Sequence, residues 1–139
     1  MVNFDYCSPT RLIFGKGVVD KLAEVMFPMG KRILLTYGGG SIKRSGLYDK
    51  VKSLLKDFEI TELGGIEPNP QYETLMKAAE IVRNESIDFI MAVGGGSVID
   101  GTKFICLASY YKGDASDLLK LGFKPITSQI VEKVIPFGT

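Results

Sequence analysis

The sequence predicts an α/β fold with a doubly wound parallel sheet. Three observations lead to this prediction. Short apolar segments alternate with longer segments of helical periodicity, two of the expected strands end in glycine runs, and no linker-like segment divides the 139 residues. Strands that alternate with helices are parallel and are joined by right-handed crossovers. We therefore expect one domain over residues 1–139.

Three segments have the character of strands. Arg32–Tyr37 and Ile87–Val93 are apolar runs that end in glycines, and Glu59–Leu63 alternates polar and apolar residues. A fourth strand is expected at Thr10–Gly15. The apolar run Ile130–Thr139 leads toward a further strand.

Helical patterns fill the gaps between these strands. Apolar residues follow one face of a helix in Leu47–Phe58 and again in Tyr72–Val82. A short helix is expected at Val18–Met26. The segment Ser97–Tyr111 is apolar nearly all round, which predicts a helix buried against the sheet.

Composition narrows the function. The net charge of +1 and the lack of a basic run argue against nucleic-acid binding, and the apolar runs are too short for a membrane span. The N-terminus lacks a signal-peptide pattern, so a cytoplasmic protein is expected. Cys7 and Cys106 do not indicate a disulfide framework. Because the chain contains no histidine, His bases and His metal ligands are excluded, and we assign no catalytic or metal-binding residue.

The run Gly94-Gly95-Gly96-Ser97 follows the strand that ends at Val93. Glycines let the backbone turn and approach a ligand without Cβ clashes. Ser97 is expected at the N-cap of the next helix, where free N–H groups and the positive helix end favour an anion such as a pyrophosphate. The same run is also compatible with a plain turn in which Ser97 only caps the helix. The usual Gly-x-Gly-x-x-Gly and Walker fingerprints are not found in their expected places.

A second run, Gly38-Gly39-Gly40-Ser41, follows the strand that ends at Tyr37. Dinucleotide sites often place a carboxylate near such a strand end to hold the ribose 2′-hydroxyl. Here the strand end carries glycine and serine, with Lys43 and Arg44 just beyond, which favours NADP over NAD. Alternatively, Lys43 and Arg44 are solvated surface charges.

Two further features lie near these loops. The segment Gly64–Pro70 holds Asn69 between two prolines, which stiffen a loop on the same edge of the sheet. Asp100 is either a first-turn acid that favours the helix dipole or a group that orients a loop amide or a ligand, and Lys103 could face the same cleft. The candidate cofactor-binding residues are Gly38, Gly39, Gly40, Ser41, Asn69, Gly94, Gly95, Gly96, Ser97 and Asp100.

Four segments, in order and at matching spacing, resemble the iron-containing (group III) alcohol dehydrogenase family. The similar branch is that of the NADP(H)-dependent butanol dehydrogenases and broad aldehyde reductases. The segments that carry the resemblance are Pro9–Gly17, Thr36–Lys43, Gly64–Pro70 and Val93–Lys103.

The resemblance implies a Rossmann-like, dehydroquinate-synthase-like N-terminal domain. It implies that Gly95, Gly96 and Ser97 bind the pyrophosphate, and that Gly38–Ser41 and Asn69 lie at the adenosine ribose. It also implies a homodimer in which Thr10–Phe14 pairs with its counterpart, and hydride transfer between NAD(P)H and a primary alcohol or aldehyde.

Family members continue into an all-helical C-terminal domain whose Asp and three His hold Fe²⁺ or Zn²⁺. We expect metal and catalysis to lie there, and these 139 residues alone to bind cofactor without turnover. One alternative is a stand-alone nucleotide-binding or dimerisation module. Another is an α/β domain with structural glycine turns and no cofactor affinity, which the four matching segments disfavour.

Overall fold

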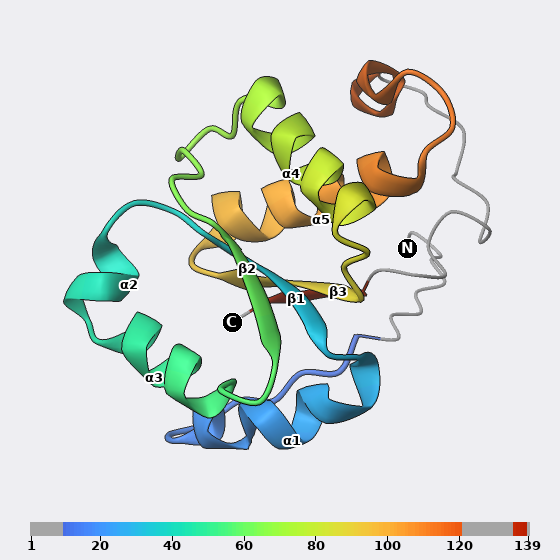
Figure 1. The fold of residues 1–139 in the computed structure, drawn as a ribbon. Coiled ribbons are helices and arrows are strands. Elements are labelled where there is room, and N and C mark those ends of the chain that lie inside the picture. Colours follow the sequence, from blue (N-terminus) through green and yellow to red (C-terminus); the bar gives the residue numbers. More distant parts are fainter. Residues whose placement is uncertain (1–9, 121–134, 139) are drawn as a thin grey trace, which may run out of the picture.

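The computed structural model describes residues 10–120 and 135–138, and these form a parallel sheet with helices around it (Figure 1). The strand order is β2-β1-β3-β4, and every neighbouring pair is parallel. The strands are β1 (Arg32–Tyr37), β2 (Glu59–Leu63), β3 (Phe89–Val93) and β4 (Ile135–Gly138).

The helices connect these strands as the periodicity predicts. The α-helices are α1 (Leu22–Met26), α2 (Ser41–Arg44), α3 (Leu47–Leu54), α4 (Tyr72–Asn84) and α5 (Gly96–Tyr110). Short 3₁₀ turns are η1 (Val18–Lys21), η2 (Phe27–Met29) and η3 (Ala115–Leu119). None of the helices in the described ranges is long and apolar enough to cross a membrane.

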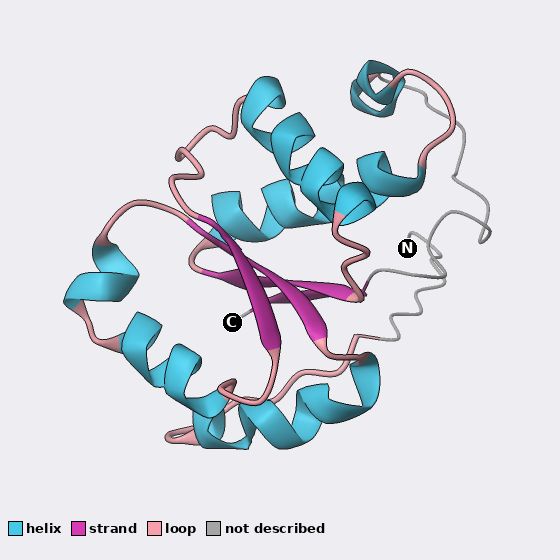
Figure 2. Ribbon diagram, viewed as in Figure 1, coloured by secondary structure: helices cyan, strands magenta, loops and turns pink. Residues whose placement is uncertain are grey.

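Helices cover both faces of the sheet (Figure 2). Ile33 and Leu35 of β1 pack in one core cluster with side chains from α1 and α3. Leu34, which points to the opposite face, packs with side chains from α4 and α5. Since alternate residues of a strand face opposite sides, a strand covered on both faces is apolar throughout. The predicted doubly wound fold is confirmed.

The strand boundaries agree with the predictions except at β3. This strand begins at Phe89, two residues later than the predicted Ile87. The side chain of Asp88 accepts hydrogen bonds from the backbone N–H groups of Lys31 and Arg32, at 2.9 and 2.8 Å. Asp88 therefore fixes the start of β1 with its side chain, and its own N–H donates to the carbonyl oxygen of Arg32 at 2.9 Å. The apolar run at the C-terminus does supply a fourth strand, β4.

The strand predicted at Thr10–Gly15 is wrong for the single chain. This segment is irregular and pairs with none of the four strands described. Leu12 and Phe14 are 85% and 93% exposed. A strand needs a neighbour for its N–H and C=O groups, and none of the described sheet edges lies alongside this segment.

A buried pair of hydroxyls ties α5 to the sheet. Thr36 Oγ1 lies 2.7 Å from Thr102 Oγ1 and also bonds the carbonyl oxygen of Met91 at 3.2 Å. Both threonines are almost completely buried. Buried hydroxyls are costly unless paired, so this contact favours one placement of α5 on β1 and β3.

Candidate cofactor-binding site

The two glycine runs lie next to each other because their strands are neighbours. Tyr37 at the end of β1 is in register with Val93 at the end of β3, so Gly38 and Gly94 begin adjacent loops. The loop after β2 joins them, because the N–H of Gly65 donates to the carbonyl oxygen of Gly38 at 3.1 Å. Three loops thus meet at the carboxyl edge of a parallel sheet, where open α/β folds bind ligands.

The first of two clefts lies between these loops and has a volume of about 220 Å³. Gly38 and Gly39 form one wall, the loop after β2 a second, and the start of α5 a third. The lining residues are Gly38, Gly39, Ile66, Glu67, Pro68, Gly95, Gly96, Ser97 and Val98.

The second cleft, of about 300 Å³, shares Gly38 and Gly39 with the first. It lies at the ends of β1 and β2, and its lining residues are Tyr37, Gly38, Gly39, Gly40, Lys43, Gly64 and Gly65. Gly38 and Gly39 therefore separate two clefts, one at the start of α5 and one beside Lys43.

The N-terminus of α5 opens into the first cleft. Gly95 is the N-cap residue, and its carbonyl oxygen accepts the N–H groups of Val98 and Ile99, each at 3.1 Å. The N–H groups of Gly96 and Ser97 precede these first helical bonds and have no acceptor within the helix. Together with the positive end of a 15-residue helix, they suit an anion.

Ser97 does not cap this helix, so that prediction is wrong. The helix begins one residue earlier, at Gly96, because Gly95 takes the extended backbone conformation of a cap. The Ser97 hydroxyl instead donates a hydrogen bond to the carbonyl oxygen of Pro68. Ser97 thus holds the loop after β2 against the start of α5, and only its backbone N–H remains to meet an anion.

The glycines of these loops are present for two different reasons. A Cβ on Gly94 would lie 2.9 Å from Cγ2 of Val98, so close packing excludes one. A Cβ on Gly39, Gly95 or Gly96 would meet nothing within 4 Å, and none of the three has a positive φ. The fold itself does not require glycine at these three positions. Their bare backbone keeps the cleft open, as the close approach of a dinucleotide phosphate requires.

The second cleft carries a network of charged and aromatic groups. Glu62 of β2 accepts hydrogen bonds from the hydroxyls of Tyr37 (3.1 Å) and Tyr48 (2.8 and 3.0 Å) and from Nζ of Lys52 (2.7 Å). The two tyrosine rings meet edge to face at 5.6 Å. The ammonium of Lys43 lies 5.3 Å from the centroid of the Tyr37 ring and 4.9 Å from that of Tyr48.

The network stabilises the ionised form of Glu62. Burial by itself would raise the pKa of this carboxyl, but the hydrogen bonds from Lys52, Tyr48 and Tyr37 outweigh it, so the pKa lies below its usual value. The hydrogen bond to Glu62 and burial together raise the pKa of Tyr48 to about 12. At neutral pH the group is therefore a carboxylate held by neutral phenols and a cation.

Four of the candidate residues, Ser41, Asn69, Gly94 and Asp100, line neither cleft. Asp100 is 76% exposed in its side chain and pairs with Lys103 at 3.2 Å. Asn69 is exposed, and its carbonyl oxygen accepts a hydrogen bond from Gln71 Nε2 at 3.1 Å. Ser41 begins α2 and is also exposed. Gly38, Gly39, Gly40, Gly95, Gly96 and Ser97 line the clefts, and Gly94 lies directly behind them.

The sequence analysis missed several polar residues of the site. Glu67 lines the first cleft, where its carboxylate accepts a hydrogen bond from Thr74 Oγ1 at 3.0 Å. That bond and one from its own backbone lower the pKa of Glu67. Tyr48, Lys52 and Glu62 were also missed. The sequence did hold one signal for these three residues: Glu62 is a charged residue on a half-buried strand, and such a residue needs polar partners.

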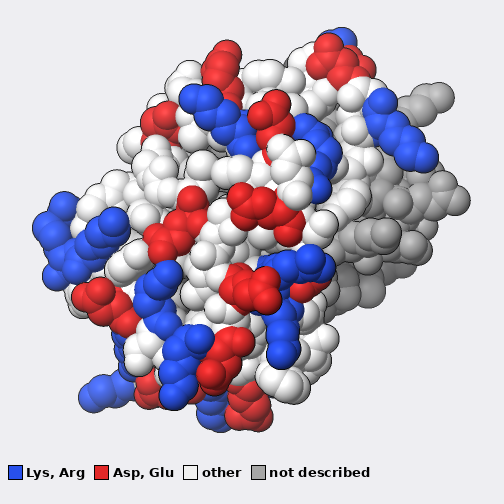
Figure 3. All heavy atoms as spheres, in the orientation of Figure 1, with Lys and Arg blue, Asp and Glu red and all other residues white. Residues whose placement is uncertain are grey.

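Basic groups gather at one end of the site. On the face drawn in Figure 3, basic and acidic side chains are interspersed, and a basic group lies where α2 is placed in Figure 1. This short helix carries Lys43 and Arg44 in its last turn. A Cβ on Gly40 would lie 3.0 Å from Nη1 of Arg44, so this guanidinium lies beside the second cleft.

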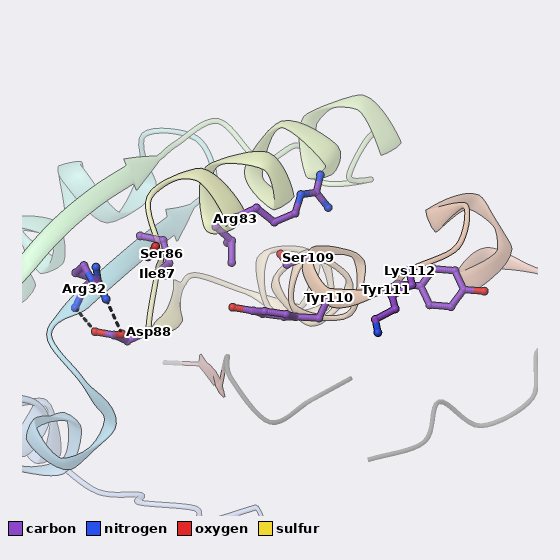
Figure 4. A pocket seen from close by; sticks show the side chains of 10 residues that line it. Arg32, Arg83, Ser86, Ile87, Asp88, Ser109, Tyr110, Tyr111 and Lys112 are labelled. Carbon is purple, nitrogen blue, oxygen red and sulfur yellow. Dashed lines mark hydrogen bonds and ion pairs between the residues drawn. The ribbon is translucent and has the colours of Figure 1, made fainter. Parts of the chain in front are cut away.

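A further cavity lies elsewhere and does not suit a cofactor phosphate. It measures about 640 Å³ and lies at the amino edge of the sheet, between Arg32, Arg83 and Tyr110 (Figure 4). The C-terminal ends of α4 and α5 reach it, and helix C-termini present carbonyl groups and a negative dipole end. Both of its arginines are already engaged within the protein: Arg32 with Asp88 at 3.6 Å, and Arg83 with the Ala108 carbonyl at 3.2 Å.

The described residues do not supply a metal centre. Within residues 10–120 and 135–138, no three His, Cys, Asp or Glu side chains are grouped as metal ligands. The chain has no histidine at all. We therefore derive no step through a metal from these residues.

The parallel sheet, the glycine loops at its carboxyl edge and the open helix N-terminus are typical of a Rossmann-like domain. The family comparison gives a narrower result: residues 9–138 match the family described as iron-containing alcohol dehydrogenase. The chain belongs to this family.

Relatives match all or nearly all of the chain. A probable NADH-dependent butanol dehydrogenase 1 of Bacillus subtilis is 50% identical over 141 residues, which cover 100% of this chain and 35% of the relative. The NADPH-dependent aldehyde reductase YqhD of Escherichia coli is 50% identical over 132 residues, 94% of this chain and 34% of the relative. The chain thus spans about a third of the length of these relatives.

Solved structures agree with the fold. The substrate- and cofactor-free form of the E. coli aldehyde reductase YqhD superposes with a TM-score of 0.84 at 50% identity, over 91% of this chain and 34% of that one. The NADH-dependent butanol dehydrogenase A of Thermotoga maritima superposes with a TM-score of 0.78 at 39% identity. The match covers 83% of this chain and 30% of that one. Relatives in this family are named for NADH in some cases and NADPH in others.

Proposed function

We propose that this chain is the cofactor-binding domain of an enzyme that transfers hydride between NAD(P)H and a primary alcohol or aldehyde. One observation carries the proposal: Gly39, Gly95 and Gly96 leave open space where side chains would stand, next to the unpaired N–H groups at the start of α5. A pyrophosphate supplies the negative charge that these groups favour.

In this role the chain binds and orients the cofactor. The N–H groups of Gly96 and Ser97 hold the pyrophosphate, and the loop after β2 is fixed beside it by the Ser97–Pro68 hydrogen bond. The bound nicotinamide supplies the hydride chemistry. In such an enzyme Fe²⁺ or Zn²⁺ would polarise the substrate oxygen, and the described residues of this chain do not form a group that could hold the ion.

We further propose NADP as the cofactor. A carboxylate that holds the ribose 2′-hydroxyl would favour NAD. Gly39 offers no carboxylate at the end of β1. Lys43 and Arg44 place positive charge beside the second cleft. A 2′-phosphate is the group that such a site favours.

The proposed assembly is a homodimer formed through Thr10–Phe14. Leu12 and Phe14 are 85% and 93% exposed in the single chain. Large apolar side chains exposed this close together in the sequence are suited to pack against a second copy of the same segment.

The test is calorimetric titration of the protein, as its gene encodes it, with NADPH and separately with NADH, followed by an assay with a primary alcohol and its aldehyde. Binding with metal-dependent turnover supports the enzyme. Binding without turnover under any metal supports the stand-alone nucleotide-binding module instead. Binding of neither nucleotide overturns the assignment of the site.

A further inference from the structure

Glu62 has a position that the proposed function does not explain. It is the last residue but one of β2, the strand beside β1, and its carboxylate accepts a hydrogen bond from Tyr37, which lines the second cleft. In many dinucleotide-binding folds a carboxylate near this point accepts the hydroxyls of the adenosine ribose. Glu62 is therefore the described residue best placed to favour NAD.

The bonds of Glu62 prevent this role. A carboxylate has about four lone-pair sites. Those of Glu62 meet the hydroxyls of Tyr37 and Tyr48 and the ammonium of Lys52, at 2.7–3.1 Å. A ribose would have to displace a charge-assisted hydrogen bond or a phenol to reach it.

The same bonds fix the two rings that lie next to Lys43. Tyr37 is buried in the core at the end of β1, and Tyr48 comes from α3, so Glu62 joins groups from three elements. The ammonium of Lys43 lies about equally far from both ring centroids, at 5.3 and 4.9 Å. A cation at this distance from an aromatic ring is attracted to it. The rings of Tyr37 and Tyr48 thus restrict the long, flexible side chain of Lys43 to the second cleft.

The local charge then favours an anion. Lys52 balances Glu62 through an ion pair of 2.7 Å. Lys43 and Arg44 remain as positive charges beside Gly39 and Gly40. The charge of the Glu62 carboxylate, which could have accepted ribose hydroxyls, is therefore balanced by Lys52. The charges of Lys43 and Arg44, which can bind a phosphate, are not balanced in this way.

We infer that Tyr48 and Glu62 are positioning residues that hold the Lys43 ammonium as the receptor for the ribose 2′-phosphate, and so give this cleft its preference for NADP. The inference rests on the proposed function, because it requires the cofactor to bind across Gly38–Gly40.

The test compares NADPH and NADH affinities, by calorimetry, in the protein as its gene encodes it. Lys43→Met is expected to weaken NADPH about tenfold, the loss of one charge-assisted contact, and to leave NADH nearly unchanged. Tyr48→Leu removes one of the two rings beside Lys43. Like Lys43→Met, it is expected to lower the preference for NADPH over NADH. Tyr48→Phe, which keeps the ring, is expected to retain more of the preference than Tyr48→Leu.

Lys56→Met is the matched control, because Lys56 is exposed just beyond α3 and lines neither cleft. It should leave both affinities as they are. A purely structural role of Tyr48 would change both affinities together, so a selective change is the informative readout. Melting temperatures establish that each variant is folded.

The outcomes separate the inference from the proposed function. An unchanged NADPH/NADH ratio in either Lys43→Met or Tyr48→Leu overturns the inference, as does a wild-type preference for NADH, while the cofactor site itself stands. If the wild type binds neither nucleotide, the proposed function fails and the inference fails with it.

Discussion

The hydroxyl of Ser97 donates a hydrogen bond to the carbonyl oxygen of Pro68, which ties the first turn of α5 to the loop after β2. Both residues line the first cleft. The donor proton of Ser97 is therefore engaged within the protein, and the backbone N–H groups are what this residue and Gly96 offer to an anion.

Replacement of Ser97 by aspartate tests whether an anion binds here. The new carboxylate would lie beside the proposed pyrophosphate, and we expect NADPH affinity to fall by about tenfold or more, since like charges at close range cost at least about 1.4 kcal/mol. Ser97→Ala is the control, because it removes only the bond to Pro68, at a cost of about 1 kcal/mol in stability. Equal affinity in the aspartate and alanine variants would refute the pyrophosphate assignment.

Gly96→Ala separates ligand binding from folding. The added methyl meets nothing within 4 Å, and alanine is favoured over glycine in a helix, so the melting temperature should hold or rise. NADPH affinity should nevertheless fall, because the methyl enters the cleft. Gly94→Ala provides the contrast: its Cβ would lie 2.9 Å from Val98, so thermal stability should drop. Undiminished NADPH binding by Gly96→Ala would mean that no ligand approaches this backbone.

Gly39→Asp supplies the carboxylate that the end of β1 lacks. The side chain would have open space, since a Cβ there meets nothing within 4 Å. We expect the NADPH/NADH affinity ratio to fall by about tenfold or more, because the carboxylate repels a 2′-phosphate and accepts a 2′-hydroxyl. Gly39→Asn has nearly the same shape without the charge and should change the ratio less. A ratio that stays constant in the aspartate variant would show that this loop does not contact the ribose.

Phe14→Lys tests the proposed dimer. Phe14 is 93% exposed in the single chain, so the substitution should not disturb the fold, and an added charge on the pairing segment should dissociate two copies. Sedimentation velocity would report the change as a shift from dimer to monomer. Phe27→Lys serves as the control, because Phe27 is 73% exposed but lies in η2, away from the segment. A wild-type protein that is monomeric at high concentration would exclude this interface.

Much of the fold could be predicted from the sequence, because a strand buried on both faces is a mostly apolar run and a half-buried edge strand alternates polar and apolar residues. Arg32–Tyr37 and Glu59–Leu63 begin and end as predicted. The strand predicted at Thr10–Gly15 is wrong for the single chain, because the residues of a segment do not specify whether a partner strand lies beside it. The residue pattern of a segment is a local property, whereas strand pairing depends on residues far away in the sequence.

The site was predictable in outline and not in its side-chain contacts. Glycine runs at strand ends mark the loops, since parallel strands bring their carboxyl ends to one edge. The bond from Ser97 to Pro68 spans 29 residues, and that from Tyr48 to Glu62 spans 14. Both depend on how a helix and a loop are placed by packing. No spacing within the sequence specifies such contacts.

Asp88→Asn tests the contact that fixes the start of β1. Asp88 Oδ2 accepts the N–H groups of Lys31 and Arg32 at 2.9 and 2.8 Å, and Arg32 Nη2 lies 3.6 Å from Oδ1. The N–H of Arg32 is the main cause that lowers the pKa of Asp88, with burial opposing it and Lys31 assisting. Loss of the charge should destabilise the protein by about 1–2 kcal/mol at neutral pH, the usual scale for hydrogen bonds to charged groups.

The pH dependence of this effect has a definite sign. Because the folded-state pKa of Asp88 lies below its unfolded value of about 3.9, its contribution is fully present well above that pH and is lost as the pH falls through the folded-state pKa. Thermal unfolding of wild type and Asp88→Asn at a series of pH values should give a constant stability difference above about pH 5 that narrows on acidification. Asp57→Asn, at an exposed turn after α3, should stay within about 0.5 kcal/mol of wild type throughout. A stability difference that persists undiminished in strong acid would mean that Asp88 acts through packing and not through its charge. Asp88 packs closely over Gly30, since a Cβ added at Gly30 would lie 2.5 Å from the Cβ of Asp88.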